Sequence, residues 1–338
     1  MPETLQEKIA FLSQPSSYPD KTSSVEAIET HMSWVFLTDQ FAYKLKKPVA
    51  YDYLDFSSLA ARRHFCEEEV RLNRRLAANV YLGTVSLVRT HRGGMELGGR
   101  GQEVECLIRM RRLPSELSLA QCIRKGVIPQ RPFDRLAEKL GLFFITSRTE
   151  SISPEQYREL CTNRVVEVIG ALAPKEYAMP RGVIRDVYRK LNTYLFVRGE
   201  VLDERATAGK IVEGHGDLRA EHVYLEDDPV VVDCLEFSRD LRTVDAAADL
   251  AFLALECERL GAASDGVRLL NRCFSIIGDK PPAHLIHFYQ TCHACSRARL
   301  ALWHLNEAQY KNDPQWREQA LEWLRLAQIH SRLMGQVS

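Results

Sequence analysis

A dense group of polar residues, GHGDLRAEHVYL, lies between two apolar runs that have the character of short core strands. The first run leads into Asp217, and the second run, Pro229–Val232, leads into Asp233. If the two strands pair as a hairpin, both carboxylates come to one edge of it. Two carboxylates in such a place suit metal binding combined with the abstraction of a proton. A single aspartate at a strand end is commonly a turn residue, but the density of this cluster favours a functional site.

Three lysines in the segment FAYKLKKPV are the second candidate for chemistry. On a strand, Lys44 and Lys46 lie on one face and Lys47 points to the other. A lysine that binds phosphate at a fixed position needs a carboxylate to hold it. The sequence therefore predicts that an acid from a neighbouring element contacts this strand.

The helix predicted over Ser57–Ala78 supplies that acid. Its apolar stripe, which includes Phe65 and Leu72, follows helical spacing, and Glu69 falls in line with it. A carboxylate on a core-facing stripe is unfavourable unless it is paired, so we expect Glu69 to pair with Lys44. If Glu69 lies at the edge of the stripe, it reaches water instead.

The composition is that of a soluble globular protein, with 45% hydrophobic and 27% charged residues in a chain of 338. Lys plus Arg equals Asp plus Glu, so the formal charge is zero and no general basic field would attract nucleic acid. No apolar run approaches the ~18 residues that span a bilayer, and the N-terminal segment lacks the apolar core of a signal peptide. We expect a cytoplasmic protein with no membrane and no nucleic-acid partner.

The nine cysteines are an odd number without the spacing of a disulfide framework, which is typical of reduced thiols in a cytosol. Cys292 and Cys295 form the one C-x-x-C pair. A zinc site would need a second pair of ligands at a suitable spacing, and the sequence offers none. We interpret the pair as cysteines of a helical core.

The elements that position these residues divide the chain in two. Trp34–Thr38 and Phe41–Leu45 read as a β-hairpin, and further short strands accompany the one strong helix of the N-terminal part. Helical periodicity dominates the rest of the chain. The pattern predicts an α+β fold with two lobes, a small β-rich lobe over residues 1–113 and a larger helical lobe over residues 114–338. A ligand is expected where the lobes meet.

Five short motifs occur in a fixed order along most of the chain. They are Ala-x-Lys at Lys44, a glutamate on the next helix at Glu69, His-Gly-Asp at Asp217, a strand-end aspartate at Asp233, and Asp-x-x-x-Asp-Leu-Ala at Asp245–Ala251. This order resembles the aminoglycoside phosphotransferase-like branch of the protein-kinase-like fold. The segments THMSWVF and EEEVRLNRRL also resemble an uncharacterised bacterial subgroup that is often fused to a P-loop ATPase. The P-loop pattern GxxxxGK[ST] itself does not occur in this sequence.

The resemblance implies transfer of a phosphoryl group from ATP, a nucleoside triphosphate, to the hydroxyl of a small molecule, with Mg²⁺ as cofactor. Lys44, held by Glu69, would contact the α- and β-phosphates. Asp217 would accept or orient the proton of the acceptor, and Asp233 would bind the metal. Asp249 would bond the backbone amides of the catalytic loop.

Two further segments would hold the nucleotide according to the same resemblance. Met110 and Arg111 begin the expected hinge after the last strand of the small lobe, where backbone groups meet adenine. The loop that covers the phosphates would be Glu29–Ser33. It lacks the GxGxxG pattern, so its backbone amides and the hydroxyls of Thr30 and Ser33 would make the contacts.

Two polar residues of the catalytic loop have supporting roles in this scheme. His215 would support the loop through hydrogen bonds. Arg219 would contact the acceptor or the transferred phosphate. Alternatively, Arg219 braces the loop by pairing with Glu221 or Asp240.

His222 departs from the family pattern. It stands five residues after Asp217, where the family usually has an asparagine as second metal ligand. Imidazole is a softer ligand than an amide oxygen and suits Mg²⁺ poorly, so His222 would favour Mn²⁺ or act by hydrogen bonding. The departure also motivates an alternative function, a pseudokinase or nucleotide-binding regulatory module.

Overall fold

The computed structural model describes residues 3–51, 54–307, 310–311 and 313–336. It divides into two compact units, which are described one at a time. Unit 1 consists of residues 1–122, 128–132 and 221–241. Unit 2 consists of residues 123–127, 133–220 and 242–338.

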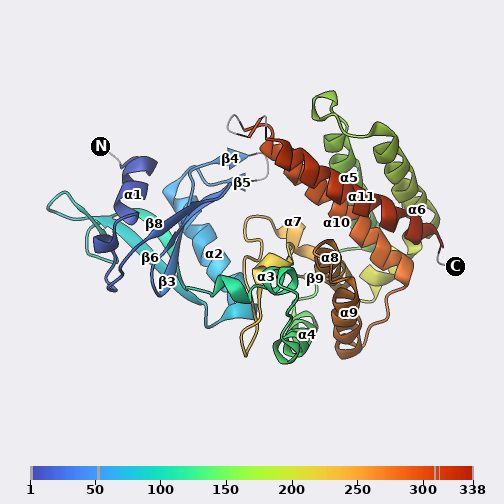
Figure 1. Ribbon diagram of the computed structural model, residues 1–338, viewed down its shortest axis with the longest axis horizontal. Helices are drawn as coiled ribbons and strands as arrows, with labels where there is room; N and C mark the ends of the chain where they lie inside the picture. Colours follow the sequence, from blue (N-terminus) through green and yellow to red (C-terminus); the bar gives the residue numbers. More distant parts are fainter. Residues whose placement is uncertain (1–2, 52–53, 308–309, 312, 337–338) are drawn as a thin grey trace. The chain divides into compact units, whose positions relative to one another are not determined.

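A six-stranded antiparallel sheet forms the body of unit 1, in the order β1-β2-β3-β8-β6-β7 (Figure 1). The predicted hairpin is confirmed as β2 and β3, which pair from Leu37 with Ala42 to Ser33 with Lys46. A separate short pair consists of β4 and β5. The strands are β1 (Glu26–Glu29), β2 (Ser33–Leu37), β3 (Phe41–Lys46), β4 (Ala50–Tyr51), β5 (Leu54–Asp55), β6 (Tyr81–Arg89), β7 (Met95–Leu97) and β8 (Gln102–Arg111).

Strand β3 separates two different environments because its side chains alternate between the faces of the sheet. Tyr43 and Leu45 pack in one apolar cluster with Leu12 of α1 (Leu5–Leu12). Lys44 and Lys46 point to the opposite face, where both contact Glu69 of α2. The sheet thus carries apolar packing on one side of β3 and charge on the other.

Helix α2 (Leu59–Ala77) packs on β6, β8 and β11. Its start agrees with the prediction, because the Ser58 side chain caps the helix by accepting a hydrogen bond of 3.1 Å from the amide of Ala61. Glu69 lies on the buried face of the helix and is fully buried. The predicted position of Glu69 on a core-facing stripe is confirmed.

The strands just before and at the end of the polar cluster each pair with a later segment of the chain. In unit 1, β10 (Val223–Tyr224) pairs with β11 (Val230–Val231), and in unit 2, β9 (Ile211–Glu213) pairs with β12 (Thr243–Asp245). The expectation that the strand before Asp217 pairs with the strand before Asp233 is therefore wrong. Strands of two or three residues carry too little side-chain pattern to select a partner from sequence.

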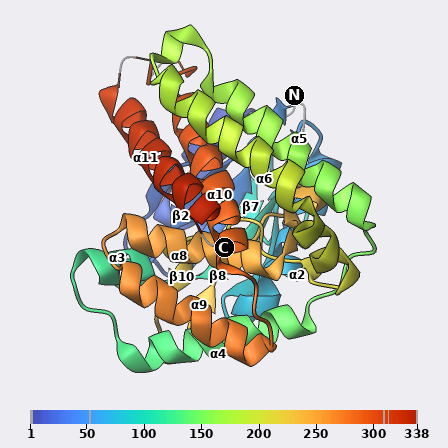
Figure 2. The same cartoon turned by 90° about the vertical axis from the view of Figure 1, so that its right-hand side faces the viewer.

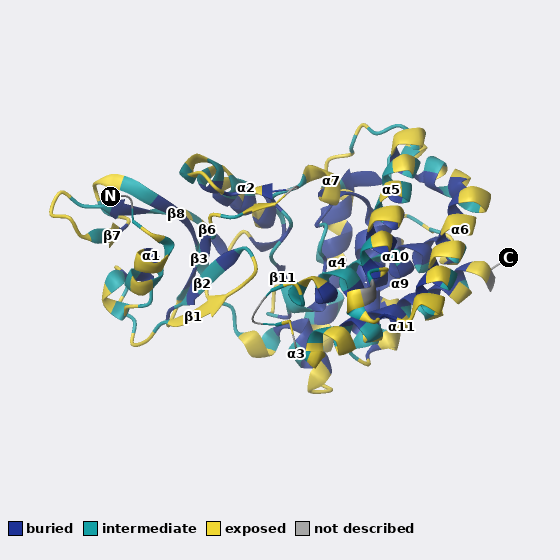
Figure 3. Ribbon diagram, turned by 90° about the horizontal axis from the view of Figure 1, so that it is seen from above, coloured by how far each residue is buried: buried dark blue, intermediate teal, exposed yellow. Residues whose placement is uncertain are grey.

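Unit 2 is built mainly from helices that pack side by side. Helices α10 (Ala283–His304) and α11 (Pro314–Gln336) form one such pair, and α5 (Pro154–Leu172) and α6 (Arg181–Thr207) form another (Figure 2). Helix α10 also contacts α5 and α8 (Ala246–Arg259). Much of α10 is buried among its neighbours (Figure 3). The helices that follow α2 are α3 (Leu119–Arg124), α4 (Gln130–Thr146), α5 (Pro154–Leu172), α6 (Arg181–Thr207), α7 (Arg239–Arg242), α8 (Ala246–Arg259), α9 (Ala263–Ile277), α10 (Ala283–His304) and α11 (Pro314–Gln336).

The predicted mixture of strands and helices is therefore present, as a β-rich unit and a helical unit. Over the described ranges, the helices all fall short of the combined length and apolarity that a bilayer-spanning segment requires.

Candidate active site

Lys44 contacts two acids within unit 1. Its Nζ lies 2.8 Å from Oε1 of Glu69 and 2.8 Å from Oδ1 of Asp233. The predicted pairing of Lys44 with Glu69 is confirmed. Burial alone would lower the pKa of Lys44, but the charges of Asp233 and Glu69 outweigh it and raise this pKa well above its ordinary value. Lys44 is therefore an ammonium group at physiological pH, ready to meet an anion.

Asp233 is held in an unusual backbone conformation. Its φ of 63° lies in the left-handed region, which residues with a Cβ rarely adopt. The amide of Asp233 donates a hydrogen bond of 3.2 Å to the hydroxyl of Tyr81, and the amide of Cys234 donates one of 2.9 Å to Oδ1 of Asn73. Residues held in this way are concentrated at functional sites. The side chain of Asp233 keeps 47% of its surface exposed, so a ligand can reach it.

His222 lies beside Asp233, so unit 1 brings the two expected metal ligands together. The Nε2 atom of His222 is 3.6 Å from Oδ2 of Asp233, which is too long for a hydrogen bond. The amide of Val232 donates a hydrogen bond of 2.9 Å to the carbonyl of His222 and keeps the two segments side by side.

This donor set fits a divalent cation that is shared with phosphate oxygens. Mg²⁺ usually takes only one or two protein ligands and completes its shell with water and phosphate. Asp233 is such a ligand, and the imidazole of His222 adds a nitrogen that Mn²⁺ accepts more readily than Mg²⁺. Within the described ranges, no group of three or more His, Cys, Asp or Glu side chains could hold a metal by itself.

The His-Gly-Asp loop of unit 2 is fixed by Asp249. The Asp249 carboxylate accepts hydrogen bonds from the amide of His215 at 2.7 Å and from the amide of Gly216 at 3.2 Å. The expected bond from Asp249 to the loop amides is therefore confirmed. The amide of Asp217 donates to Nδ1 of His215 at 3.3 Å, as expected for a supporting histidine. A Cβ at Gly214 would lie 2.6 Å from Oδ2 of Asp249, so the close approach of loop and carboxylate requires glycine there.

Asp249 is positioned in turn by a network that the sequence did not reveal. Asp245 caps the start of α8 by accepting from the amide of Ala247 at 2.8 Å. Arg205 donates to both oxygens of Asp245, at 2.7 and 2.6 Å, and also pairs with Asp279. The hydroxyl of Tyr289 donates to Asp245 at 2.9 Å. Arg205 could not be singled out from sequence because arginines on long helices are usually exposed.

The residues expected to bind adenine lie on β8, whereas Ser33, which is expected to bind phosphate, lies on β2. Met110 and Arg111 are the last two residues of β8, and the Arg111 amide donates to the carbonyl of Val80 at 2.9 Å. The expected hinge at this end of β8 stays a prediction. The Arg111 side chain pairs with both oxygens of Glu226, at 2.8 and 2.6 Å.

Ser33 begins β2 and is buried, and its amide donates to the hydroxyl of Thr30 at 3.0 Å. The two expected roles of Arg219 stay predictions.

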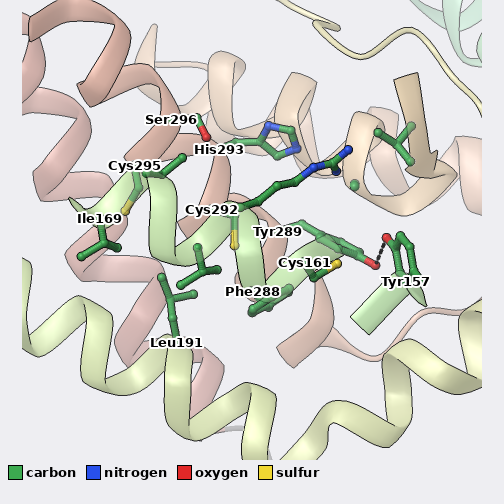
Figure 4. Close-up of a pocket in the computed structure, with 15 residues that line it drawn as sticks. Tyr157, Cys161, Ile169, Leu191, Phe288, Tyr289, Cys292, His293, Cys295 and Ser296 are labelled. Carbon is green, nitrogen blue, oxygen red and sulfur yellow. Dashed lines mark hydrogen bonds between the residues drawn. The ribbon is translucent and has the colours of Figure 1, made fainter. Parts of the chain in front are cut away.

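A cavity of about 90 Å³ lies among the helices of unit 2 (Figure 4). Its wall is mostly apolar and contains several thiols, two hydrogen-bonded tyrosines and an imidazole. The lining residues are Tyr157, Cys161, Arg164, Val165, Val168, Ile169, Leu191, Val244, Ala248, Phe288, Tyr289, Cys292, His293, Cys295 and Ser296. None of them is Asp or Glu. One of them, Arg164, carries a guanidinium group, so the wall disfavours a cationic group.

His293 lies in the cavity wall, near the His-Gly-Asp loop. It stacks on Phe252 at 4.4 Å between ring centroids and lines the cavity. Burial lowers the pKa of His293 to about 4, and the nearby charge of Asp217 counteracts part of that effect. His293 is thus neutral at physiological pH and lies within electrostatic range of Asp217.

The C-x-x-C pair lies on α10, as expected for helical cysteines. Burial raises the pKa of the Cys295 thiol to about 12 and raises that of Cys292 well above its usual value. Protonated thiols are poor nucleophiles and poor metal ligands. Their role is packing in the wall of the cavity.

Comparison with curated proteins finds uncharacterised proteins of Mycobacterium tuberculosis and Mycobacterium bovis. Each is 32% identical over 279 residues, which is 82% of this chain and 54% of the relative. The chain thus spans about half the length of the curated relatives it matches. No family model matches the chain.

Solved structures similar to the whole chain are phosphotransferases. An aminoglycoside 2'-phosphotransferase-IIIa in complex with GDP has a TM-score of 0.54 at 14% identity and covers 97% of this chain and 99% of its own. A choline/ethanolamine kinase family protein of Mesorhizobium loti has a TM-score of 0.53 at 14% identity, covering 96% and 99%. Choline kinase LicA in complex with AMP has a TM-score of 0.52 at 15% identity, covering 98% and 100%. With its β-rich unit and helical unit, the chain has the protein-kinase-like fold of these enzymes.

Proposed function

We propose that the chain is an ATP-dependent phosphotransferase that transfers a phosphoryl group to a hydroxyl of a small molecule. The observation that carries the proposal is the contact of the Lys44 ammonium with both Glu69 and Asp233, at 2.8 Å each. Phosphoryl transfer is catalysed almost entirely by positioning and by charge neutralisation. A lysine held by a buried acid, next to an exposed acid, supplies both.

Each charged residue has one task in this mechanism. Lys44 would bind phosphate oxygens, with Glu69 fixing its position. Asp217 would orient the acceptor hydroxyl and take its proton, from the loop that Asp249 keeps rigid. When bound, Mg²⁺ or Mn²⁺ supplies further positive charge to the phosphates, and Asp233 with His222 would hold it.

The nucleotide would be held by residues at the strand ends of unit 1. Ser33, the first residue of β2, would contact phosphate. The end of β8, at Met110 and Arg111, would meet adenine. His215 supports the catalytic loop, and Arg219 would contact the acceptor or the transferred phosphate.

The acceptor would place an uncharged group in the cavity of unit 2. The cavity wall includes His293, which lies within electrostatic range of Asp217, and the guanidinium of Arg164, and none of its lining residues is an acid that would attract a cation. Acceptors as strongly cationic as aminoglycosides or choline would be poorly matched to this wall. We therefore expect a small neutral alcohol or a compound with a neutral end.

The test is phosphate transfer by the purified protein from ATP to a panel of alcohols, sugars, aminoglycosides and choline, in Mg²⁺ or Mn²⁺. Transfer to any acceptor that disappears in Asp217→Asn supports the proposal. Equal rates in the wild type and in Asp217→Asn would contradict it. A preference for choline or aminoglycosides would refute the role of the unit 2 cavity in binding the acceptor, while the proposal of phosphoryl transfer would still stand.

A second candidate function is a nucleotide-binding module without catalysis, and it is favoured by His222 in the place of the usual asparagine. The imidazole 3.6 Å from Asp233 could weaken the binding of Mg²⁺. Calorimetry would measure ATP binding, which both functions predict. The phosphate-transfer assay then separates them, because the module would transfer phosphate no faster than Asp217→Asn does.

We further propose that the chain belongs to the uncharacterised bacterial subgroup whose members are often fused to a P-loop ATPase. The chain corresponds to 54% of its curated relatives, which agrees with a resemblance to proteins that carry an additional P-loop ATPase part. A cytoplasmic location is likewise proposed, since the free thiols suit a reducing compartment.

A further inference from the structure

A second lysine, Lys46, shares Glu69 with Lys44. The two lysines lie two residues apart on β3 and therefore on the same face. Glu69 Oε1 accepts from Lys44 at 2.8 Å, and Glu69 Oε2 accepts from Lys46 at 2.6 Å. Both oxygens of the carboxylate are thus occupied by different ammonium groups.

Lys46 also contacts Glu236, which lies three residues after Asp233. Lys46, Glu69 and Glu236 are almost completely buried, with side chains 1%, 0% and 8% exposed. The Lys46 ammonium further lies 5.0 Å from the centre of the Phe56 ring, a cation–π contact. These contacts join β3, α2 and the segment after Asp233 into one buried ionic cluster.

The side chains of Lys44 and Lys46 differ in how accessible they are to solvent and to a ligand. The Lys44 side chain is 16% exposed and bonds to the half-exposed Asp233, whereas the Lys46 side chain is 1% exposed and bonds to the buried Glu69 and Glu236. Lys46 is therefore unsuited to binding a ligand directly. Its contacts are internal to unit 1.

We propose that Lys46 is a positioning residue that frees Lys44 to exchange partners, an inference that rests on the proposed function. Lys44 now neutralises Asp233. When a metal–nucleotide complex binds, Lys44 must turn to phosphate and Asp233 to the metal. A buried carboxylate that loses its only cation is strongly disfavoured. Because Lys46 stays on Glu69, Lys44 can leave Asp233 and share its charge with phosphate without leaving Glu69 unneutralised.

Without Lys46, Glu69 would depend on Lys44 alone and would hold it more tightly. Glu236 would also lose its ion pair with Lys46, and the segment that presents Asp233 would lose this anchor on β3. Both effects weaken the binding of the metal–nucleotide complex. They act before the chemical step, so the Michaelis constant for ATP should change more than the turnover number.

The experiment compares Lys46→Met with Lys8→Met. Lys8 is a matched control, because it is a buried lysine of unit 1 that lies 2.8 Å from Glu105, and Glu105 keeps a second cation, Arg62. Both variants should lose stability. Only Lys46→Met should raise the Michaelis constant for ATP with Mg²⁺, by about tenfold, the effect of losing one charge-assisted contact. Lys46→Arg should restore most of the affinity.

A double variant covers the case in which Lys46→Met does not fold. Lys46→Met combined with Glu236→Gln removes both charges and leaves no unpaired acid at position 236. It should show the same rise in the Michaelis constant. If the Michaelis constant in Lys46→Met or the double variant changes no more than in Lys8→Met, the proposal is overturned.

Nucleotide binding separates this proposal from the proposed function. If the wild type transfers no phosphate, the readout becomes the rise in unfolding temperature caused by ATP with Mg²⁺. A smaller rise in Lys46→Met than in Lys8→Met supports the positioning role even though phosphotransfer has failed. An equal rise in both variants, or no rise in the wild type, overturns it.

Discussion

The Nζ atom of Lys44 lies 2.8 Å from Oδ1 of Asp233, although 189 positions separate the two residues in the chain. The contact joins β3, an inner strand of the sheet, to the segment that follows β11. It places a permanent cation beside the acid expected to hold the metal, so the chemistry of unit 1 depends on how this pair is made and broken.

Substitution of Lys44 by methionine should abolish activity but leave most of the stability. Glu69 keeps its contact with Lys46 at 2.6 Å, so no buried acid is left without a cation. We expect kcat/KM to fall by at least about a hundredfold, because a charge aimed at the phosphates is lost. Steady-state kinetics and thermal unfolding measure the two effects. A large loss of stability with little loss of activity would contradict this division between the lysines.

Substitution of Asp249 by asparagine should lower kcat without changing the affinity for ATP. The neutral side chain would hold the amides of His215 and Gly216 less firmly, and displacement of a catalytic loop by about 1 Å can cost a hundredfold in rate. Kinetics with varied ATP measure both parameters. Asp265→Asn, at a surface acid in the first turn of α9, is the control and should behave as the wild type. An unchanged kcat in Asp249→Asn would show that the loop needs no such anchor.

Substitution of His222 by asparagine should shift the metal preference from Mn²⁺ to Mg²⁺. Imidazole nitrogen suits Mn²⁺ better, and an amide oxygen suits Mg²⁺. We expect the ratio of the Mg²⁺-supported rate to the Mn²⁺-supported rate to rise by about tenfold, a typical effect of altering the surroundings of a metal. Addition of EDTA should stop the reaction in both proteins. His91→Asn, in an exposed turn, serves as the control, and an unchanged ratio in His222→Asn would exclude the residue from the metal site.

Substitution of Arg205 by methionine should destabilise unit 2 by about 3 to 5 kcal/mol, as expected when buried acids lose their cation. Arg205 is 7% exposed and bonds to both Asp245 and Asp279. Chemical denaturation measures the free energy of unfolding. Arg189→Met, which removes an exposed arginine paired with Asp186, should change it by less than about 1 kcal/mol. Equal effects of the two substitutions would mean that the network contributes little.

Stability should fall as the pH is lowered from about 6.5 toward about 4, the window set by His293. The folded-state pKa of His293 lies below its ordinary value, so the unfolded chain binds the proton more readily and gains population as the pH falls. Burial also lowers the pKa of His287, which acts in the same direction. Unfolding temperatures measured across this range test the prediction. His293→Gln should flatten the profile, and a slope identical to that of the wild type would assign the effect to other groups.

Much of the architecture could be predicted from local pattern. The β2–β3 hairpin, the helix capped by Ser58 and the helix that begins at Ala246 all follow from alternation, helical spacing and capping residues. Glu69 was identifiable because a carboxylate on an apolar stripe must have a partner. The bond from Asp249 to the loop was implied by the resemblance to the phosphotransferase-like family.

The sequence by itself determined which residues carry the charge of the candidate site, since residue type and spacing are local properties. Only the tertiary structure decided the strand partners, the left-handed backbone of Asp233 and the contact of Lys46 with Glu236. From sequence, one acid, Glu69, was expected on this face of the strand, and the structure adds Asp233 and Glu236. Which acids they are depends on a segment about 190 residues away, and closure of so long a loop is governed by the packing of the whole chain rather than by any local pattern.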